Sequence, residues 1–330
     1  MKYATGSAFR RALETRLRTL SQREGVPLAR LRKLVAFDRL LARLLQAEPE
    51  TWVLKGGLAL QLRLGPRART TKDVDVMWRQ SAFDLHQRLI DVAALDVNDW
   101  FRYTVEQPNA GQEALLGGGR RFFVHALLDS RPFELFHVDV GVDDPMLEPV
   151  QFLAMPALLD FADIAPALVP CYPITQQLAE KVHAYTRPHV TGESSRVKDL
   201  VDILLLAGLQ PLLGLTLRLA LQATFEARNT HPLPATLAPP PESWAQPLRR
   251  MADETGLAWR DLDEATTAAM QFLNPVAAKP TGRRVEPDHV GLGSLLTFQP
   301  AVAAAGRRVP LCSGAQENSN DSASERRRSG

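Results

Sequence analysis

The chain has 330 residues, 45% hydrophobic and 23% charged, an ordinary globular composition and a length that fits one large domain or two smaller ones. The formal net charge of +2 gives no global field that would by itself indicate a nucleic-acid-binding protein. Lys and Arg nevertheless outnumber Asp and Glu by 11 to 5 in residues 1–50 and by 6 to 2 in residues 51–79, which is compatible with a phosphate-rich partner or with a solvated, Arg-rich helix surface.

The first 100 residues are predicted to contain helices separated by short strands. Apolar residues recur at helical spacing in four segments, and Pro27 suits the first turn of the second. The period-two alternation of DVDVMW and the short apolar run TWVL indicate strands. We expect the helices at residues 7–22, 27–47, 58–65 and 80–95. We expect the strands at residues 51–54 and 73–78.

A strand-rich stretch follows, and after it a helical stretch. Alternating segments predict strands at residues 100–107, 120–129 and 132–142, with the Gly-rich LLGGGR as a turn. Helical periodicity then returns and fades beyond Asn274. These helices are expected at residues 174–187, 195–208, 210–229, 243–256 and 261–273. The side chains of Trp52, Trp78 and Trp100 are expected in the core of the strand-rich part.

This order of elements predicts an α+β protein with two domains. The expected parts are N-terminal helices at 1–50, an α/β domain at 51–172, a helical domain at 173–279 and a tail of disordered composition at 280–330. Cys171 and Cys312 lie far apart, without the spacing of a zinc site or a disulfide framework. The chain has neither an apolar run of about 18 residues nor a secretory signal at its start. We therefore expect a cytoplasmic protein with no membrane partner.

The sequence Asp73-Val74-Asp75 is a candidate metal-binding motif. Residues two apart in a strand project from the same face, so the two carboxylates would repel each other unless a cation lay between them. Carboxylates are the preferred ligands of Mg²⁺, which also keeps substrate phosphates in its shell. Asp139, in FHVDVGV, has the same apolar flanks, and on an adjacent strand it could complete a site for phosphoryl transfer.

The Gly56-Gly57 pair follows a predicted strand and opens a predicted helix. Because glycine has no Cβ, its backbone N–H can approach a triphosphate closely, and a helix N-terminus favours an anion. Each feature alone is weak: a Gly-Gly pair is usually only a turn, and Asp-x-Asp pairs are common at exposed strand ends. The order of strand, Gly-Gly, helix, Asp-x-Asp strand and later Asp strand is more specific.

In this order, the residues resemble the nucleotidyltransferase superfamily with its polymerase-beta-like fold, whose pattern is hG[G/S]…[D/E]h[D/E]h…h[D/E]h. Within it, VLKGGLALQLRLG…RTTKDVDV is similar to the AbiEii/AbiGii toxin family of type IV toxin–antitoxin systems. That family has a Lys-Gly-Gly motif followed by an Arg-x-Thr-x-x-Asp-x-Asp-like run. The matching residues, with one added residue of uncertain register, are Lys55, Gly56, Gly57, Arg69, Thr70, Asp73 and Asp75.

A second block strengthens the resemblance, which covers roughly residues 28–275. LAEKVHAYTRPHVTGESSRVKDLVDILLL resembles the Glu-Lys…Arg-x-Lys-Asp-Leu-x-Asp helices of the family. Asp199 and Asp202 would share one helix face. With Lys181, such a cluster could hold the phosphates, base or ribose of a nucleotide, or it could be only a surface salt-bridge network on two antiparallel helices. The matching residues are Lys181, Arg196, Lys198, Asp199 and Asp202.

The resemblance implies a mixed sheet with flanking helices and a C-terminal helical lobe. It implies a Mg²⁺- or Mn²⁺-dependent enzyme that transfers nucleotides from an NTP to an RNA such as a tRNA 3′ end and thereby blocks growth, in phage defence, with an antitoxin encoded alongside. Asp73, Asp75 and Asp139 would hold the metals, and the Gly-Gly pair and Lys181 the triphosphate. Lys198, Asp199 and Asp202 would shape the nucleotide or acceptor site.

Two other functions stay open at this point. The same metal site could transfer a nucleotide to a small molecule such as an aminoglycoside, although the basic N-terminal part mildly disfavours a cationic acceptor. The chain could also be a non-catalytic module that binds an NTP. The presence of all three aspartates, Asp73, Asp75 and Asp139, argues against the second function.

Overall fold

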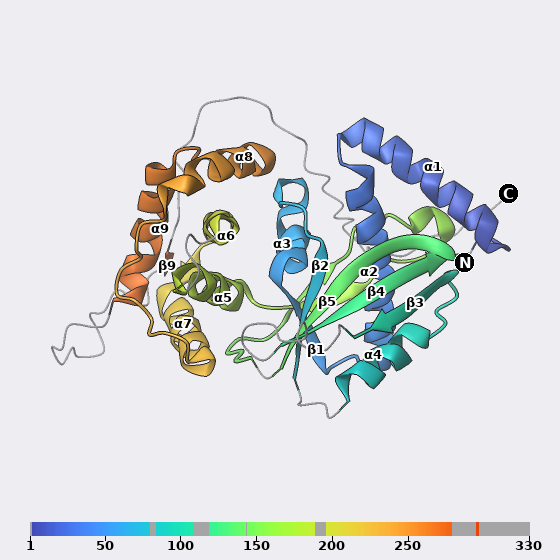
Figure 1. Cartoon of the computed structure of the whole chain (residues 1–330), viewed down its shortest axis with the longest axis horizontal. Coiled ribbons are helices and arrows are strands. Elements are labelled where there is room, and N and C mark those ends of the chain that lie inside the picture. The colour runs from blue at the N-terminus through green and yellow to red at the C-terminus, as the bar shows by residue number, and fades with distance from the viewer. Residues whose placement is uncertain are drawn as a thin grey trace, which may run out of the picture. The chain divides into compact units, whose positions relative to one another are not determined.

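A computed structural model describes residues 2–79, 84–107, 119–142, 144–188, 196–278 and 295–296. Residues 1–300 belong to one compact unit, most of whose helices and strands are labelled in Figure 1. Most of the tail predicted at residues 280–330 lies outside the described residues. Within that tail, Leu295–Leu296 (β9) pairs antiparallel with Leu212–Leu213 (β8), so the chain returns there to the helical part. The domain boundaries predicted within residues 1–279 stay a prediction.

A mixed seven-stranded sheet forms the centre of the N-terminal half. Its order is β3-β4-β5-β2-β1-β7-β6, in which β2 runs parallel to β5, β1 runs parallel to β7, and the remaining neighbours are antiparallel. The mixed sheet predicted from the sequence is confirmed, and β6 and β7 are additional strands of four residues each. The strands are β1 (Trp52–Lys55), β2 (Asp73–Trp78), β3 (Phe101–Glu106), β4 (Arg120–Leu128), β5 (Arg131–Val142), β6 (Gln151–Ala154) and β7 (Leu168–Cys171).

Four helices accompany the sheet, and their ends follow the expected local signals. The side chain of Thr5 accepts a hydrogen bond from the N–H of Ala8 at the start of the first helix, and Gly25 ends that helix with φ +68°. In Figure 1, α1, α2 and α4 gather around β3, β4 and β5, whereas α3 lies beside β2. The helices are α1 (Gly6–Glu24), α2 (Leu28–Ala47), α3 (Gly56–Leu64) and α4 (Leu85–Ala94).

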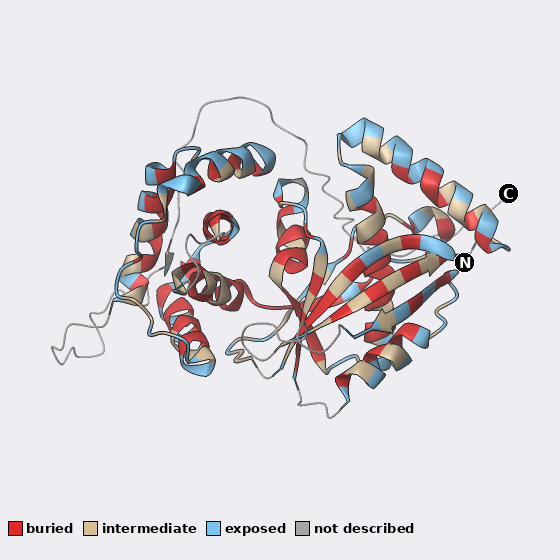
Figure 2. Ribbon diagram, in the orientation of Figure 1, coloured by how far each residue is buried: buried red, intermediate tan, exposed pale blue. Residues whose placement is uncertain are grey.

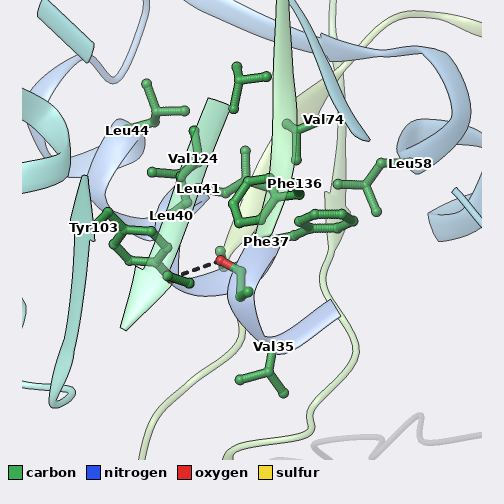
Figure 3. Packing of buried hydrophobic residues seen from close by; sticks show 14 of the residues in the cluster. Val35, Phe37, Leu40, Leu41, Leu44, Leu58, Val74, Tyr103, Val124 and Phe136 are labelled. Atoms are coloured by element: carbon green, nitrogen blue, oxygen red, sulfur yellow. Dashed lines mark hydrogen bonds between the residues drawn. The ribbon is translucent and has the colours of Figure 1, made fainter. Parts of the chain in front are cut away.

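The main hydrophobic core lies between α2 and the sheet. Phe37 of α2 packs edge to face on Phe136 of β5, with 4.9 Å between ring centroids, and the Tyr103 hydroxyl donates a 2.8 Å hydrogen bond to the carbonyl of Ala36 (Figure 3). Such aromatic contacts add to the free energy gained by burying apolar surface. The core therefore fixes the position of β5 against the N-terminal helices.

Two of the three tryptophans expected in the core are buried. Trp52 and Trp78 are less than 2% exposed, but Trp100 is 42% exposed, so that expectation was wrong. Trp100 precedes β3 with φ +62°, in the left-handed region, which turns its side chain outward. Its indole N–H donates a 3.4 Å hydrogen bond to the carbonyl of Tyr3.

The C-terminal half is a group of helices around a second hydrophobic cluster, as predicted. α6 is buried on nearly all sides (Figure 2). Lys198 is the exposed residue along it. The helix predicted at 210–229 begins only at Gly214, because Leu212–Leu213 forms β8. None of the helices in the described part of the chain has the length and apolar character needed to cross a membrane. The helices are α5 (Ile174–Thr186), α6 (Val197–Ala207), α7 (Gly214–Arg228), α8 (Ala245–Thr255) and α9 (Leu262–Ala277).

A buried histidine of α5 is expected to make stability depend on pH. His183 forms a 2.9 Å hydrogen bond with the Thr230 hydroxyl and packs on Phe225. Burial, followed by the neighbouring His231 ring, lowers the pKa of His183 to about 4. The unfolded chain, with a pKa near 6.5, therefore takes up this proton first, so the free energy of unfolding falls as the pH drops from about 6.5 to about 4. The loss is at most about 3 kcal/mol.

Urea unfolding at pH 6.5, 5 and 4 measures this effect. His183→Gln removes the titration while keeping a polar partner for Thr230, so its stability should fall less than that of the wild type over the same interval. His125→Gln, at a half-exposed position on β4, serves as the control and should keep the wild-type pH dependence. A steep loss that persists unchanged in His183→Gln would assign the effect to another group.

Candidate active site

The three predicted aspartates lie together on two neighbouring strands. β2 and β5 are parallel, and their register places Asp75 directly opposite Asp139. Asp73 shares a face with Asp75, while Val74 and Val76 are fully buried behind them. All three aspartates line one cavity. Their carboxylates therefore converge at one face of the sheet, as the sequence led us to expect.

Asp73 and Asp75 are held in place by neutral donors. The Thr71 hydroxyl donates a 2.9 Å hydrogen bond to Asp73, and the Gly57 N–H donates a 3.3 Å hydrogen bond to Asp75. Burial and, after it, the carboxylates of Asp73 and Asp139 raise the pKa of Asp75 to about 6. The two strands therefore concentrate negative charge at one point, which favours a bound cation.

The Gly56-Gly57 corner leaves room for the residues that face it. Gly56 has φ +62°, and a Cβ there would lie only 2.0 Å from a carboxylate oxygen of Asp75. A Cβ on Gly57 would lie 2.6 Å from the hydroxyl oxygen of Thr71. The sequence suggested glycine here for the approach of a phosphate. The structure adds a reason within the protein: the missing Cβ atoms leave room for the side chains of Asp75 and Thr71 at the start of α3.

Gly56→Ala should lower the free energy of unfolding by about 3 kcal/mol or more, because it combines a left-handed backbone with a steric clash. Gly25→Ala is the matched control, since Gly25 also has positive φ but no atom within 4 Å of its would-be Cβ. That control should cost only about 1–2 kcal/mol. Both values come from urea unfolding at pH 7. Equal losses in the two variants would show that Asp75 does not need the space at Gly56.

The opposite wall of the cavity carries the second predicted block. The Lys181 ammonium of α5 lies 2.8 Å from Asp202 and 3.1 Å from Asp199, both on α6. Burial alone would lower the pKa of Lys181, but the carboxylates of Asp202 and Asp199 raise it above the usual value for lysine. Salt bridges do connect the two helices, as the alternative interpretation held, but they are buried and reach the cavity rather than the outer surface.

Asp202 has a different environment from the other predicted residues. Its side chain is fully buried and outside the cavity lining, and Arg69 donates two parallel hydrogen bonds of 2.9 and 2.8 Å to it. Both oxygens of Asp202 are thus engaged by cations, with Lys181 as the second. This arrangement suits a residue that positions Lys181 and Arg69, and not one that touches a nucleotide.

The remaining predicted residues divide between the cavity and the surface. Arg196 and Lys198 line the cavity, with Arg196 3.6 Å from Asp199 and Lys198 exposed. Thr70 is exposed and does not line it, whereas the next residue, Thr71, is buried and does. Thr71, one position beyond the predicted Thr70, is therefore the threonine that faces the cavity.

Lys55 belongs to a charge cluster that the sequence did not reveal. Its ammonium pairs with Asp144 and, at 3.0 Å, with Glu180. Arg228 of α7 pairs with the same two carboxylates at 2.8 and 3.0 Å. Glu180 directly precedes Lys181 in the Glu-Lys motif of the second block, so it could have been proposed from the sequence. No sequence pattern pointed to Asp144 or Arg228. Lys55 is therefore engaged by protein carboxylates at the cavity wall.

Arg121 of β4 was also not predicted from the sequence, although it pairs with one of the three predicted metal ligands. It donates two hydrogen bonds of 2.7 Å each to the two carboxylate oxygens of Asp139. Within the described residues, no three His, Cys, Asp or Glu side chains are arranged as a ready metal site. The predicted three-carboxylate centre is therefore not preassembled, because a guanidinium holds its third member. The oxygen donors of Asp73 and Asp75 still suit Mg²⁺ or Mn²⁺.

The cavity between the sheet and the helices has a volume of about 650 Å³. Gly57, Asp73 and Asp75 line it from the sheet side, and Lys181 and Asp199 from the helical side. Such a volume is in the range of small-molecule sites. A mixed sheet with paired aspartates beside a Gly-Gly helix start, facing a helical lobe with a buried lysine, is the architecture expected of the polymerase-beta-like nucleotidyltransferase fold.

The family follows from the sequence as a whole. The family described as nucleotidyl transferase AbiEii toxin, type IV TA system, matches residues 39–272, so the chain belongs to this family of toxin–antitoxin nucleotidyltransferases. The resemblance predicted from the two motif blocks is confirmed. None of the curated proteins matches the chain.

Several solved structures are similar in fold at low sequence identity. One is MenT4, a nucleotidyltransferase toxin from Mycobacterium tuberculosis H37Rv, with 20% identity, a TM-score of 0.43, and coverage of 57% of this chain and 61% of that chain. JHP933 from Helicobacter pylori has 15% identity and a TM-score of 0.36 over 74% and 90% of the two chains. The antibiotic-resistance factor ANT(2'')-Ia has 16% identity and a TM-score of 0.32 over 59% and 94%.

Proposed function

We propose that the chain is a Mg²⁺-dependent toxin that transfers nucleotides from an NTP to an RNA, with a tRNA 3′ end as the acceptor, and thereby arrests growth. The observation that carries the proposal is the placement of Asp73, Asp75 and Asp139 across one cavity from Lys181. Carboxylates on one wall and a cation on the other suit a metal-bound triphosphate.

The sheet side would hold the metal and the reacting phosphate. Asp73 and Asp75 would bind Mg²⁺, or Mn²⁺ in its place, and Asp139 would join them. The metal would supply positive charge that stabilises the transferring phosphoryl group. Gly56 and Gly57 at the start of α3 line the same cavity, and backbone N–H groups there would support the triphosphate.

The remaining residues would orient the reactants and move a proton. Lys181, fixed by Asp199 and Asp202, would neutralise part of the triphosphate charge. The acceptor hydroxyl would attack the α-phosphorus and give its proton to Asp139. A new P–O bond would form as the bond to the β-phosphate oxygen breaks, and pyrophosphate would leave with that bonding pair.

The charges at the cavity support an RNA acceptor over an aminoglycoside. A cationic acceptor would need free carboxylates, but Asp144 and Glu180 are both paired with Lys55 and Arg228. On the helical side, the exposed Lys198 adds positive charge at the cavity. An acceptor with a phosphate backbone fits these charges better.

The family implies an antitoxin as the partner of this toxin. We further propose that the chain acts in the cytoplasm, where NTPs and tRNA are available, and in phage defence. The division into N-terminal helices, a catalytic α/β domain and a helical domain, with boundaries at residues 50, 172 and 279, is part of this proposal.

A labelling experiment tests the reaction. The protein is incubated with Mg²⁺ and each α-³²P-labelled NTP in turn, with total RNA, with an aminoglycoside or with no acceptor. We expect label in RNA of tRNA size with one or more NTPs, and none after addition of a chelator. Label on the aminoglycoside instead would favour the small-molecule reaction. NTP binding without transfer to any acceptor would favour a non-catalytic module.

A further inference from the structure

Arg121 and Asp139 form a cross-strand pair in the lining of the cavity. They are directly opposite each other on the antiparallel strands β4 and β5, so the register fixes their proximity. The guanidinium donates to both carboxylate oxygens, at 2.7 Å each. A bidentate pair of this kind engages the oxygens that would otherwise be directed at a metal ion.

The three aspartates of the site are held by different kinds of donor. Asp73 and Asp75 accept hydrogen bonds from a hydroxyl and a backbone N–H, which bring no net charge. Asp139 is bonded instead by a full positive charge. Arg121 therefore offsets part of the mutual repulsion of the carboxylates in the metal-free protein, and a divalent cation at the same place would make its charge unnecessary and would repel it.

Arg121 is also placed so that it can leave. Its side chain is 35% exposed, whereas that of Arg69, which holds Asp202 in the same bidentate way, is 17% exposed on a fully buried partner. Moving Arg121 away would leave the Asp139 side chain, which is 11% exposed, whereas moving Arg69 away would leave the fully buried Asp202. Arg69–Asp202 thus suits a fixed support, and Arg121–Asp139 an exchangeable contact.

We propose that Arg121 occupies Asp139 in the metal-free protein, yields it to the incoming metal ion, and then pairs with the triphosphate that the metal brings. This rests on the proposed metal-dependent function. Arg121 lines the cavity and has five N–H donors suited to phosphate oxygens. The exchange would couple the arrival of the metal to the binding of the nucleotide.

Two titrations with opposite expected signs test the exchange. Mn²⁺ alone, added to chelator-treated protein and followed by the electron paramagnetic resonance signal of free Mn²⁺, should bind Arg121→Gln about fivefold more tightly than wild type, because a competitor is lost. Inorganic tripolyphosphate with Mg²⁺, followed by calorimetry, should bind the same variant about tenfold more weakly, because a phosphate ligand is lost. Arg121→Lys should shift both affinities in the same directions by less.

Arg120→Gln is the matched control. Arg120 is the preceding residue on β4, exposed and on the other face of the sheet, so its loss changes the net charge equally without touching Asp139. Both of its affinities should equal those of the wild type. If Arg121→Gln shifts both affinities in one direction, or no further than Arg120→Gln does, the exchange is wrong.

A third variant separates this inference from the proposed function. Asp75→Asn should abolish Mn²⁺ binding if Asp75 belongs to the metal site. If it does so while Arg121→Gln binds Mn²⁺ like the wild type, the metal site stands and the exchange at Asp139 is rejected. If Mn²⁺ binds Asp75→Asn as it binds the wild type, or binds neither, the proposed metal site fails and the exchange fails with it.

Discussion

Asp75→Asn is expected to lose nucleotide transfer by several orders of magnitude while becoming more stable. The activity falls because the amide cannot replace a carboxylate as a metal ligand, and charge stabilisation is most of what a phosphoryl-transfer enzyme supplies. The stability rises because burial and, after it, the like charges of Asp73 and Asp139 disfavour the charged Asp75 carboxylate, and the amide carries no charge. An amide oxygen can still accept the hydrogen bond from the Gly57 N–H.

Two measurements on one preparation check this prediction. Transfer is followed with the labelled NTP and RNA, and stability by urea unfolding at pH 7 without divalent metal, where a gain of about 1 kcal/mol is expected. Asp91→Asn is the control, since Asp91 is exposed on α4 and the substitution makes the same change of charge outside the cavity lining. Activity of Asp75→Asn within about tenfold of wild type, which is only ~1.4 kcal/mol, would reject Asp75 as a ligand.

The carboxylate face could be predicted because its pattern is local. In a strand the period is two, so Asp73 and Asp75 had to share a face whatever the rest of the fold. The pairing of β2 with β5 joins residues more than 60 positions apart, and the sequence suggested it only through the repeated apolar flanks of Asp139. The resemblance to the family indicated the order of the motifs along the chain. Only the structure showed that the parallel register places Asp75 directly opposite Asp139.

The partners of these residues could not be predicted, because they depend on side chains that meet only after folding. Arg121 alternates with buried residues along β4, like any exposed charge on a strand. Arg228 and Asp144 come from a helix end and a loop, and neither position has a sequence pattern that points to Lys55. The exposed Trp100 was missed for a related reason, since a positive φ in a non-glycine residue leaves no composition signal.

Loss of toxicity in site variants is the second large effect that we expect. Expression of the chain alone should arrest bacterial growth, and Asp73→Ala or Lys181→Ala should relieve the arrest. The two changes act on different parts of the reaction, since Asp73 would hold the metal and Lys181 the triphosphate. Their combination should be no less toxic than either alone, because either one already prevents productive nucleotide binding.

Lys181→Ala needs a measure of protein level, since Lys181 pairs with the buried carboxylates of Asp199 and Asp202. Removing one partner of a buried ion pair can cost about 3–5 kcal/mol, although Arg69 remains on Asp202. Soluble protein is therefore quantified in every culture, and relief of arrest counts only at equal abundance. Lys72→Ala is the matched control: Lys72 is exposed next to Asp73 but outside the cavity lining, so this variant should stay fully toxic.

The RNA of the arrested cells identifies the cause of the arrest. Sequencing of tRNA 3′ ends should find added nucleotides in cells that express the wild type or Lys72→Ala, and none with Asp73→Ala or Lys181→Ala. The arrest and the added nucleotides should appear together, since both follow from transfer at Asp73 and Lys181. Arrest that persists in both site variants, with unmodified RNA ends, would mean that the chain acts by binding a partner through surfaces that neither residue reaches.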